Sequence, residues 1–334
     1  MMTETGAQGI QRGTRLAKVT LFNPDGEKLL SKPKLVGGFS TGILSFSFAR
    51  YPWAMDYYRK MGGNFYNPQQ FNLTKENKDY ASLSDVERKT YERTILSGLI
   101  LESILQSNIH EIGPYISSPD LLAVLSAMEY QLTEHCDTYS HIINSAVPES
   151  RREAVLESWR TVDQIKQKSM LYVEQLKKFQ KDQQIVELHR NILTSSVIAG
   201  AIIPTEFTVI YALARHSKVV GTSNALKYVQ RDLLMQAEFL QILIKTLAVE
   251  NPLLATPDIR KDSVELIREL VKIETDFIHY VSEAMIPGLS EVMITRFSQS
   301  LCNRIGKTCG FDMVFPGITM SPIPWFDTFT EVKR

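Results

Sequence analysis

Residues 125–143 read LSAMEYQLTEHCDTYSHII and lie inside a long predicted helix. The run Ser118-Pro119-Asp120 opens this helix with a cap, a first-turn proline and a first-turn acid in order. The helix should end before Pro148. His135 and Tyr139 are four positions apart, so they lie one turn apart on the same helix face. This segment therefore predicts a long helix that presents an imidazole and a phenol side by side.

Long helices with short connections are predicted on both sides of this segment, as the spacing of apolar residues indicates. Residues 1–50 are irregular and are expected to form an arm on the body. Residues 51–334 show no linker or change in composition, which favours a single helical domain. Mostly apolar helices should be central in a large all-α bundle. The further helices are expected at about 84–109, 149–181, 186–215, 223–251, from 256 onward, and 289–307.

The amino-acid composition of this 334-residue chain limits the classes of function that it can have. Its 37 basic and 37 acidic residues balance, so nothing favours binding to nucleic acid or to an anionic membrane. The first twenty residues lack the apolar core of a signal peptide. The most apolar run, 192–214, contains Pro204 and Glu206, and we interpret it as a buried helix instead of a membrane span. Three sparse cysteines suit a reducing compartment, so the cytoplasm is expected.

Several separate segments resemble the radical-generating small subunit of class I ribonucleotide reductase, a member of the ferritin-like superfamily. Residues 125–143 resemble the helix that carries one Glu-x-x-His pair and the radical tyrosine. Residues 231–236, Arg-Asp-Leu-Leu-Met-Gln, resemble the second such helix. Residues 64–76 resemble the approach to the first lone acid, and Ser-Pro-Ile-Pro-Trp at 321–325 resembles the C-terminal signature. The likeness extends from about residue 21 to residue 329, in the right order, and implies a ferritin-like helical bundle.

The resemblance also implies a set of metal ligands. In di-metal bundles two helices each give a lone acid and two others each give Glu-x-x-His. Carried over by position, Glu76 stands at the first lone acid and His135 at the first histidine. The remaining ligand positions hold other residue types, namely Leu132, Ala199, Leu233 and Gln236. One carboxylate, one imidazole and one amide cannot neutralise and hold two cations, so no metal cofactor is expected.

The same resemblance assigns three candidate catalytic residues. Tyr139 stands at the radical tyrosine, and a modified Tyr139 is one possibility. Asp232 matches an acid that orients a histidine and joins the radical-transfer route. Tyr66 replaces the tryptophan of that route. A structural interpretation competes with each role: His135 would be a core histidine bonded to Glu76 or Tyr139, the Tyr139 hydroxyl would simply be satisfied, and Asp232 would pair with its neighbouring arginine.

A relocated metal site needs other acids on the same helices. Glu129 lies one turn before Leu132, and Glu206 lies two turns after Ala199, so both could face inward. We favour the interpretation that these acids pair with basic side chains or face solvent, because acids are rarely buried unpaired. The candidates for a relocated site are Glu102, Glu129, Glu134, Glu206 and Glu238.

Three functions stay open at this point. The chain could be a metal-free, radical-bearing reductase subunit, although the metal-free branch of the family carries a lysine at a replaced glutamate and this chain does not. It could be a non-catalytic paralogue that forms a dimer with a true small subunit. It could also be a redeployed bundle whose residues Glu76, His135, Tyr139 and Gln236 line a small-molecule pocket.

The resemblance implies partners as well. A homodimer is expected, with a reductase catalytic subunit or a paralogous small subunit as a possible further partner. Family members continue past the Pro-Trp signature with a tail that docks the catalytic subunit, whereas this sequence ends nine residues after Trp325. We expect either a truncated sequence or an unusual mode of engagement.

Overall fold

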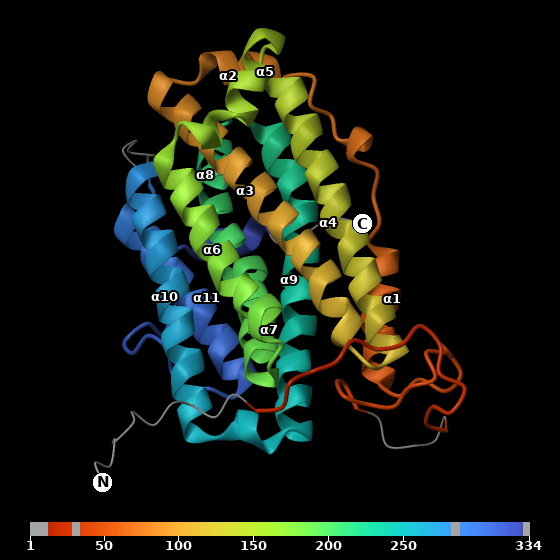
Figure 1. Ribbon diagram of the computed structural model, residues 1–334. Helices are drawn as coiled ribbons and strands as arrows, with labels where there is room; N and C mark the ends of the chain where they lie inside the picture. Colours follow the sequence, from red (N-terminus) through yellow and green to blue (C-terminus); the bar gives the residue numbers. More distant parts are fainter. Residues whose placement is uncertain (1–12, 29–33, 282–287, 330–334) are drawn as a thin grey trace.

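The computed structural model describes residues 13–28, 34–281 and 288–329, and these residues form an all-α bundle (Figure 1). The predicted all-α class is confirmed: the described residues contain helices and two isolated β-bridges. The predicted helix from 256 onward is observed as α10. The helices are α1 (Pro52–Gly63), α2 (Glu76–Ser82), α3 (Asp85–Ile112), α4 (Pro119–Ala146), α5 (Glu149–Leu156), α6 (Asp163–Asp182), α7 (Ile185–Val197), α8 (Ile203–Arg215), α9 (Val220–Glu250), α10 (Pro257–Val281) and α11 (Glu291–Cys309).

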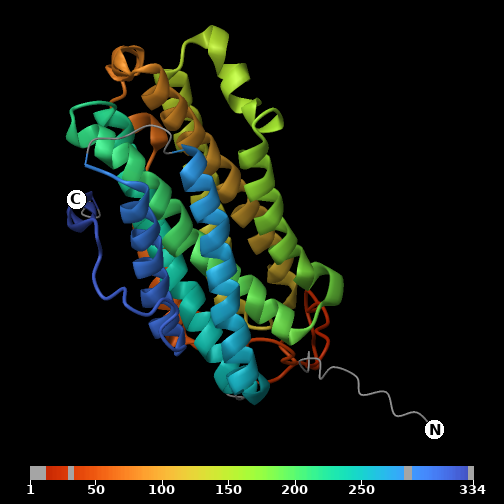
Figure 2. The same cartoon turned by 90° about the vertical axis from the view of Figure 1, so that its left-hand side faces the viewer.

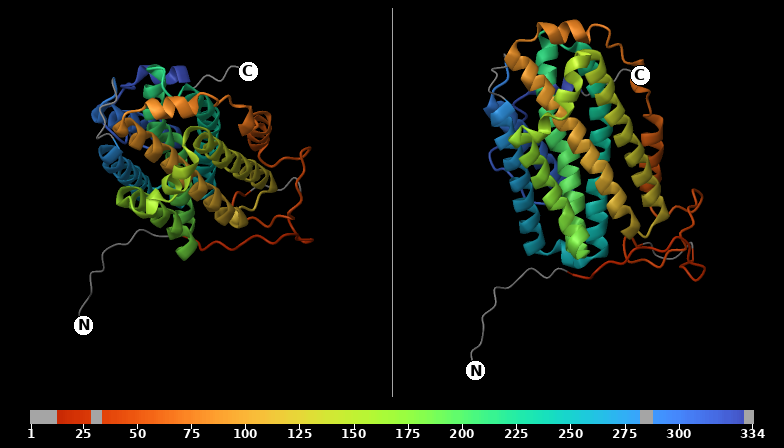
Figure 3. Two further views of the ribbon diagram at one scale, coloured as in Figure 1. Left: turned by 90° about the horizontal axis from the view of Figure 1, so that it is seen from above. Right: turned by 45° about the horizontal axis from the view of Figure 1, so that its top comes forward.

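The long helices run side by side along one axis, as the views in Figures 1 and 3 show. Helices α3 and α4 pack along each other, and α7, α8 and α9 pack behind them. Helices α6, α10 and α11 cover the remaining side, which Figure 2 turns toward the viewer. From 185 to 213 nearly every residue of α7 and α8 is buried, so these apolar helices are central as expected.

Two predicted helices are interrupted. The helix predicted at 149–181 is α5, a short 3-10 turn and α6, with Val162 in an extended conformation before α6. The helix predicted at 186–215 contains a π-helical segment, 198–202, between α7 and α8. Pro204, the second residue of α8, follows after Ile203, and a proline lacks the N–H that a regular helix would need there. The short helices α1 and α2 were not predicted.

The N-terminal segment lies at the end of the bundle where α4 begins and α9 ends (Figure 1). The backbone N–H groups of Arg50 and Tyr51 both donate to Asp120 in the first turn of α4. Glu250, the last residue of α9, accepts from the Leu35 N–H at 2.7 Å and from the Tyr51 hydroxyl at 2.6 Å. These contacts fix residues 34–51 onto the helices.

The helical stretch 185–215 is long and apolar enough to cross a membrane, judged by length and composition alone. In this structure 94% of its most apolar window is buried inside the protein. It is a core helix in this fold, as the sequence interpretation held.

Candidate functional site

A buried acid, imidazole and phenol meet between α3 and α4. The Tyr139 hydroxyl donates to Glu102 Oε1 at 2.6 Å, and Glu102 Oε2 lies 2.5 Å from His135 Nδ1. All three residues have no exposed surface. His135 and Tyr139 share a face of α4 because they are one turn apart, and Glu102 faces them from the middle of α3. One carboxylate therefore joins the phenol and the imidazole.

Gly98 makes room for the Tyr139 hydroxyl. It lies one turn before Glu102 on α3, and a Cβ atom at this position would come within 2.5 Å of the hydroxyl oxygen. No residue with a side chain would fit here without displacing the phenol. The close approach of α3 to Tyr139 therefore depends on glycine at position 98.

A chain of charged groups leads from His135 toward the surface. His135 Nε2 lies 3.6 Å from Asp232 Oδ2 on α9. Asp232 accepts from Asn64 Nδ2 at 3.0 Å and from Arg231 Nε at 2.9 Å. The Asp232 side chain is buried, whereas that of Arg231 is 24% exposed. The Arg231–Asp232 pair is thus a real ion pair, and it also holds the acid beside His135.

The charges of the site favour a protonated imidazole. Burial lowers the pKa of His135, but the carboxylates of Glu102 and Asp232 outweigh burial and raise it to about 9. Burial and the neighbouring Glu102 raise the pKa of Tyr139 well above the usual value of a phenol. At neutral pH the site therefore combines an imidazolium cation with a neutral phenol.

The positions that the resemblance assigns to metal ligands are filled by a packed core. Leu132, Ala199 and Leu233 are each at most 1% exposed and belong to the main apolar cluster. Gln236 Nε2 donates to Gln131 Oε1 at 3.0 Å, so an amide pair spans α9 and α4. Among the described residues, no three His, Cys, Asp or Glu side chains form a group that could hold a metal ion. This donor set does not fit a dinuclear centre, which needs several carboxylates to neutralise two cations.

The assignment of Glu76 to the first lone acid is wrong for this structure. Glu76 lies at the start of α9, where its Oε1 accepts from the Gly221 N–H at 2.6 Å and its Oε2 from the Thr222 hydroxyl at 2.7 Å. It satisfies free N–H groups at a helix N-terminus, a favourable place for an acid. Asp232 lies eleven residues further along α9, about 16 Å away at the rise of an α-helix. Glu102 is the acid that contacts His135.

A sequence signal for Glu102 exists. It is the lone charged residue between Ile95 and Leu105, an otherwise uncharged run on α3. An acid in such a run must be buried and therefore paired. From the sequence, Glu102 was expected only as a candidate for a relocated metal site.

The other acids considered for a relocated site pair or face outward. Glu129 lies 3.3 Å from His110, and Glu238 is exposed. Burial raises the pKa of Glu134, which hydrogen-bonds with Tyr130.

Glu206 belongs to a second buried cluster, in which its pairing with a basic side chain was expected but the identity of that partner, Lys168, was not. The Lys168 ammonium contacts Glu206 and lies 2.8 Å from Glu274 Oε2, and Ser97 bonds both Lys168 and Glu206. Burial raises the pKa of Glu274 to about 8, despite the opposing effect of Lys168. One buried ammonium group therefore lies between two acidic side chains, of which Glu274 is mostly protonated at neutral pH.

Tyr66 lies beside this site. It is 7% exposed, and its hydroxyl is 3.1 Å from the Thr138 hydroxyl. Its ring is nearly parallel to the His135 ring, with centroids 6.5 Å apart. The structure therefore brings together Tyr66, His135, Tyr139 and Asp232.

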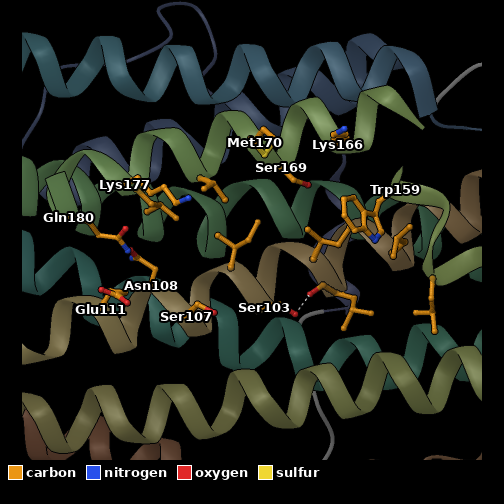
Figure 4. A pocket seen from close by; sticks show the side chains of 17 residues that line it. Ser103, Ser107, Asn108, Glu111, Trp159, Lys166, Ser169, Met170, Lys177 and Gln180 are labelled. Carbon is orange, nitrogen blue, oxygen red and sulfur yellow. Dashed lines mark hydrogen bonds between the residues drawn. The ribbon is translucent and has the colours of Figure 1, made fainter. Parts of the chain in front are cut away.

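The pocket expected around Glu76, His135, Tyr139 and Gln236 is not present as one site, because Glu76 lies well away from the other three. A groove of about 670 Å³ lies elsewhere, between α3 and α6 (Figure 4). Apolar side chains of both helices line it, with Trp159 at one end.

Comparisons with known proteins agree on one family. Residues 45–322 match the family described as ribonucleotide reductase, small chain. The ribonucleoside-diphosphate reductase subunit beta of Treponema pallidum is 26% identical over 326 residues, which cover 97% of this chain and 93% of that protein. The ribonucleotide reductase R2 subunit from Clostridium botulinum superposes with a TM-score of 0.92 at 26% identity, over 96% of this chain and 100% of that one. The dimanganese(II)-NrdF of Streptococcus sanguinis shares the fold, with a TM-score of 0.76 at 13% identity over 86% of this chain and 99% of that one.

Proposed function

The chain belongs to the ribonucleotide reductase small-chain family, and we propose that it acts in deoxyribonucleotide synthesis as a radical-bearing subunit without a dinuclear metal site. Tyr139 is the redox residue of this proposal, and Glu102 is its proton acceptor. The observation that supports this proposal most directly is the 2.6 Å hydrogen bond from the Tyr139 hydroxyl to Glu102, in a site that is closed to solvent.

The proton arrangement supports oxidation of Tyr139. A buried phenol that loses an electron must also lose its proton, because a phenol cation is costly in a low-dielectric interior. Glu102 already accepts the hydrogen bond, so the proton has a short path. The other oxygen of Glu102 faces His135, whose pKa of about 9 makes it a cation at neutral pH.

The charge balance supports the absence of two metals. In a dinuclear site the carboxylates are neutralised by metal cations. In this chain the buried acids are flanked by cations of the protein itself instead. Glu102 and Asp232 lie beside His135, Asp232 also pairs with Arg231, and Glu206 and Glu274 lie beside Lys168. The pKa of Glu274 is raised to about 8, so this acid is mostly protonated and uncharged at neutral pH. Lys168 is on α6, so it stands at none of the replaced ligand positions.

A second function is supported by the packed core. Leu132, Ala199 and Leu233 fill their positions without leaving an open centre, which is what a non-catalytic paralogue would need for stability. Such a paralogue would dimerise with a true small subunit and would not need Tyr139. The retained Tyr139–Glu102–His135 contacts favour the radical-bearing function over this one.

We also propose a homodimer in the cytoplasm, with a reductase catalytic subunit or a paralogous small subunit as further partner and with no nucleic acid or membrane. The balanced charge of the chain supports the last two exclusions.

The function is tested by reductase turnover of the full chain with its cognate catalytic subunit. Tyr139→Phe should abolish turnover, because phenylalanine has no hydroxyl to oxidise. Tyr172→Phe is the matched control: Tyr172 is equally buried, and its hydroxyl donates to the Leu270 carbonyl. Equal turnover in both variants would reject the radical-bearing function and leave the paralogue.

A further inference from the structure

A buried ion cluster lies near Tyr139 and takes no part in the proton transfer described above. Its members are Lys168 on α6, Glu206 on α8 and Glu274 on α10, and each of these side chains is at most 3% exposed. Moving such groups out of water costs free energy that their mutual attraction offsets only in part, and apolar side chains in their place are often as stabilising or more so. Stability alone therefore does not account for the cluster.

Helix α3 connects the cluster to Tyr139. The Ser97 hydroxyl donates to Glu206 Oε1 at 3.0 Å and accepts from the Lys168 ammonium at 3.1 Å. The next residue is Gly98, where a Cβ atom would meet the Tyr139 hydroxyl. Because consecutive Cα atoms are about 3.8 Å apart, Glu206 and the Tyr139 hydroxyl are separated by on the order of 10 Å.

The two acids of the cluster differ in charge. Glu206 accepts hydrogen bonds from both Lys168 and Ser97, which favours its charged form. Burial raises the pKa of Glu274 to about 8, so this acid is mostly protonated at neutral pH. Glu206 therefore carries the negative charge of the cluster.

The two acids also differ in their position relative to Tyr139. Burial and Glu102 raise the pKa of Tyr139, and Glu206 adds to this effect, so the charge of Glu206 acts on the phenol. Glu274 is on α10, and Figures 1 and 3 show α10 and α4 on opposite sides of the bundle. Lys168 thus holds a charged carboxylate on the side of Tyr139 and a neutral acid on the far side.

Oxidation of Tyr139 leaves its site more positive by one charge. A one-electron oxidant takes one electron from the phenol, whose proton moves to Glu102 along the existing hydrogen bond. Tyr139 becomes a neutral radical, and the Glu102 carboxylate becomes a neutral acid. A negative charge nearby stabilises this product relative to the resting site.

We propose that Lys168 is a positioning residue for the redox site: it holds Glu206 as a buried carboxylate near Tyr139, and the charge of Glu206 stabilises the oxidised state of Tyr139. This inference rests on the proposed function and adds the group that sets the driving force for oxidation of Tyr139.

The test compares two isosteric substitutions that contact the same ammonium group. In Glu206→Gln the Glu274 carboxyl ionises beside Lys168, so the negative charge moves to α10, away from Tyr139. In Glu274→Gln, the matched control, the charge stays on Glu206. Urea unfolding of both variants checks that the fold is kept.

The full chain is oxidised by flash-quench with photogenerated tris(bipyridine)ruthenium(III), and the product is measured by freeze-quench electron paramagnetic resonance. The signal of Tyr139 is the part that Tyr139→Phe removes. Glu206→Gln should lower the yield of this signal about three- to tenfold, since one charge about 10 Å away changes an equilibrium by about tenfold at an effective dielectric constant of about 20. Glu274→Gln should leave the yield unchanged.

A second readout separates an electrostatic role from a structural one. At high field the gx component of the Tyr139 radical senses charge near the phenol oxygen, and it should shift in Glu206→Gln alone. The triple variant Lys168→Met/Glu206→Gln/Glu274→Gln removes all three charged groups and serves if Glu206→Gln does not fold. It should show the same loss of yield as Glu206→Gln.

Each result decides the inference. Equal yields and equal gx values in Glu206→Gln and the wild type would overturn it, as would an equal loss in Glu274→Gln or the absence of any Tyr139 signal in the wild-type chain. The experiment does not depend on reductase turnover. A chain inactive with its catalytic subunit could still show the difference between the two variants, and an active chain could lack it, so the two failures are distinguishable.

Discussion

The Tyr139 hydroxyl occupies the space in which residue 98 would place a Cβ atom, and Gly98 is the residue that permits it. The contact between Gly98 on α3 and Tyr139 on α4 holds these two helices close together. The fit brings Glu102, one turn further along α3, within hydrogen-bond distance of the same hydroxyl.

Gly98→Ala should destabilise the protein, although alanine is the better helix former by about 1 kcal/mol. The added methyl group would overlap the phenol, and overpacking a core costs about 1–3 kcal/mol. Urea unfolding measures the change. The double variant Gly98→Ala/Tyr139→Phe should recover only part of the loss, because it removes the oxygen at 2.5 Å but keeps the ring carbons Cζ and Cε1, which would lie 2.8 and 3.0 Å from the added Cβ atom. A single variant more stable than the wild type would contradict the packing described here.

Stability should fall as the pH rises through the pKa of His135. Glu102 and Asp232 raise this pKa to about 9, above the value of about 6.5 for an unfolded histidine. A raised pKa means that the folded state holds the proton more tightly. The contribution of His135 protonation to the free energy of unfolding is therefore fully present below about pH 6.5 and is lost between about pH 6.5 and 9.

The size of this effect is on the order of 3 kcal/mol. It is measured as the free energy of unfolding at pH 6 and pH 10, in the wild type and in His135→Gln. The glutamine variant controls for other groups that titrate in the same range, such as Glu274. An equal pH dependence in both proteins would show that His135 is not a buried cation.

Glu76 and Glu102 should respond differently to the same substitution. Glu76→Gln replaces one of the two accepting oxygens by an amide N–H₂, which then faces either the Gly221 or the Thr222 donor, and it removes a negative charge from the start of α9. It should cost about 1–2 kcal/mol of stability. It should leave the redox behaviour of Tyr139 unchanged.

Glu102→Gln should instead slow or abolish oxidation of Tyr139, because an amide does not accept the phenol proton. Radical yield under flash-quench oxidation measures both variants. If Glu76→Gln lowered the yield and Glu102→Gln did not, the assignment of the acid beside His135 to α3 would be wrong.

The sequence predicted the fold better than it predicted the site. Helix starts were placed well where a local signal marks them: the capping box of Ser84 and Glu87 opens α3, and the Ser118-Pro119 pair opens α4. The break at Val162 has no such signal, because a charged segment reads equally well as one helix or two.

Contacts between helices were harder to predict. Glu76 and Glu102 are both acids before α4, and choosing between them requires the rotation of one helix relative to another, which spacing along the chain does not contain. Lys168 lies in a helix rich in charged residues, so periodicity alone did not mark it as buried. The family resemblance located His135, Tyr139 and Asp232, since each belongs to a motif with a fixed internal spacing.

The central claim is that Tyr139 works beside Glu102 and His135 without a pair of metal ions. The most direct test is elemental analysis of the purified full chain, with intact mass and an electron paramagnetic resonance spectrum on the same sample. We expect well below one equivalent of iron or manganese per chain, together with a radical signal, or an added oxygen mass, that Tyr139→Phe removes. Two equivalents of iron or manganese would contradict the claim and would show that a dinuclear site exists in this chain.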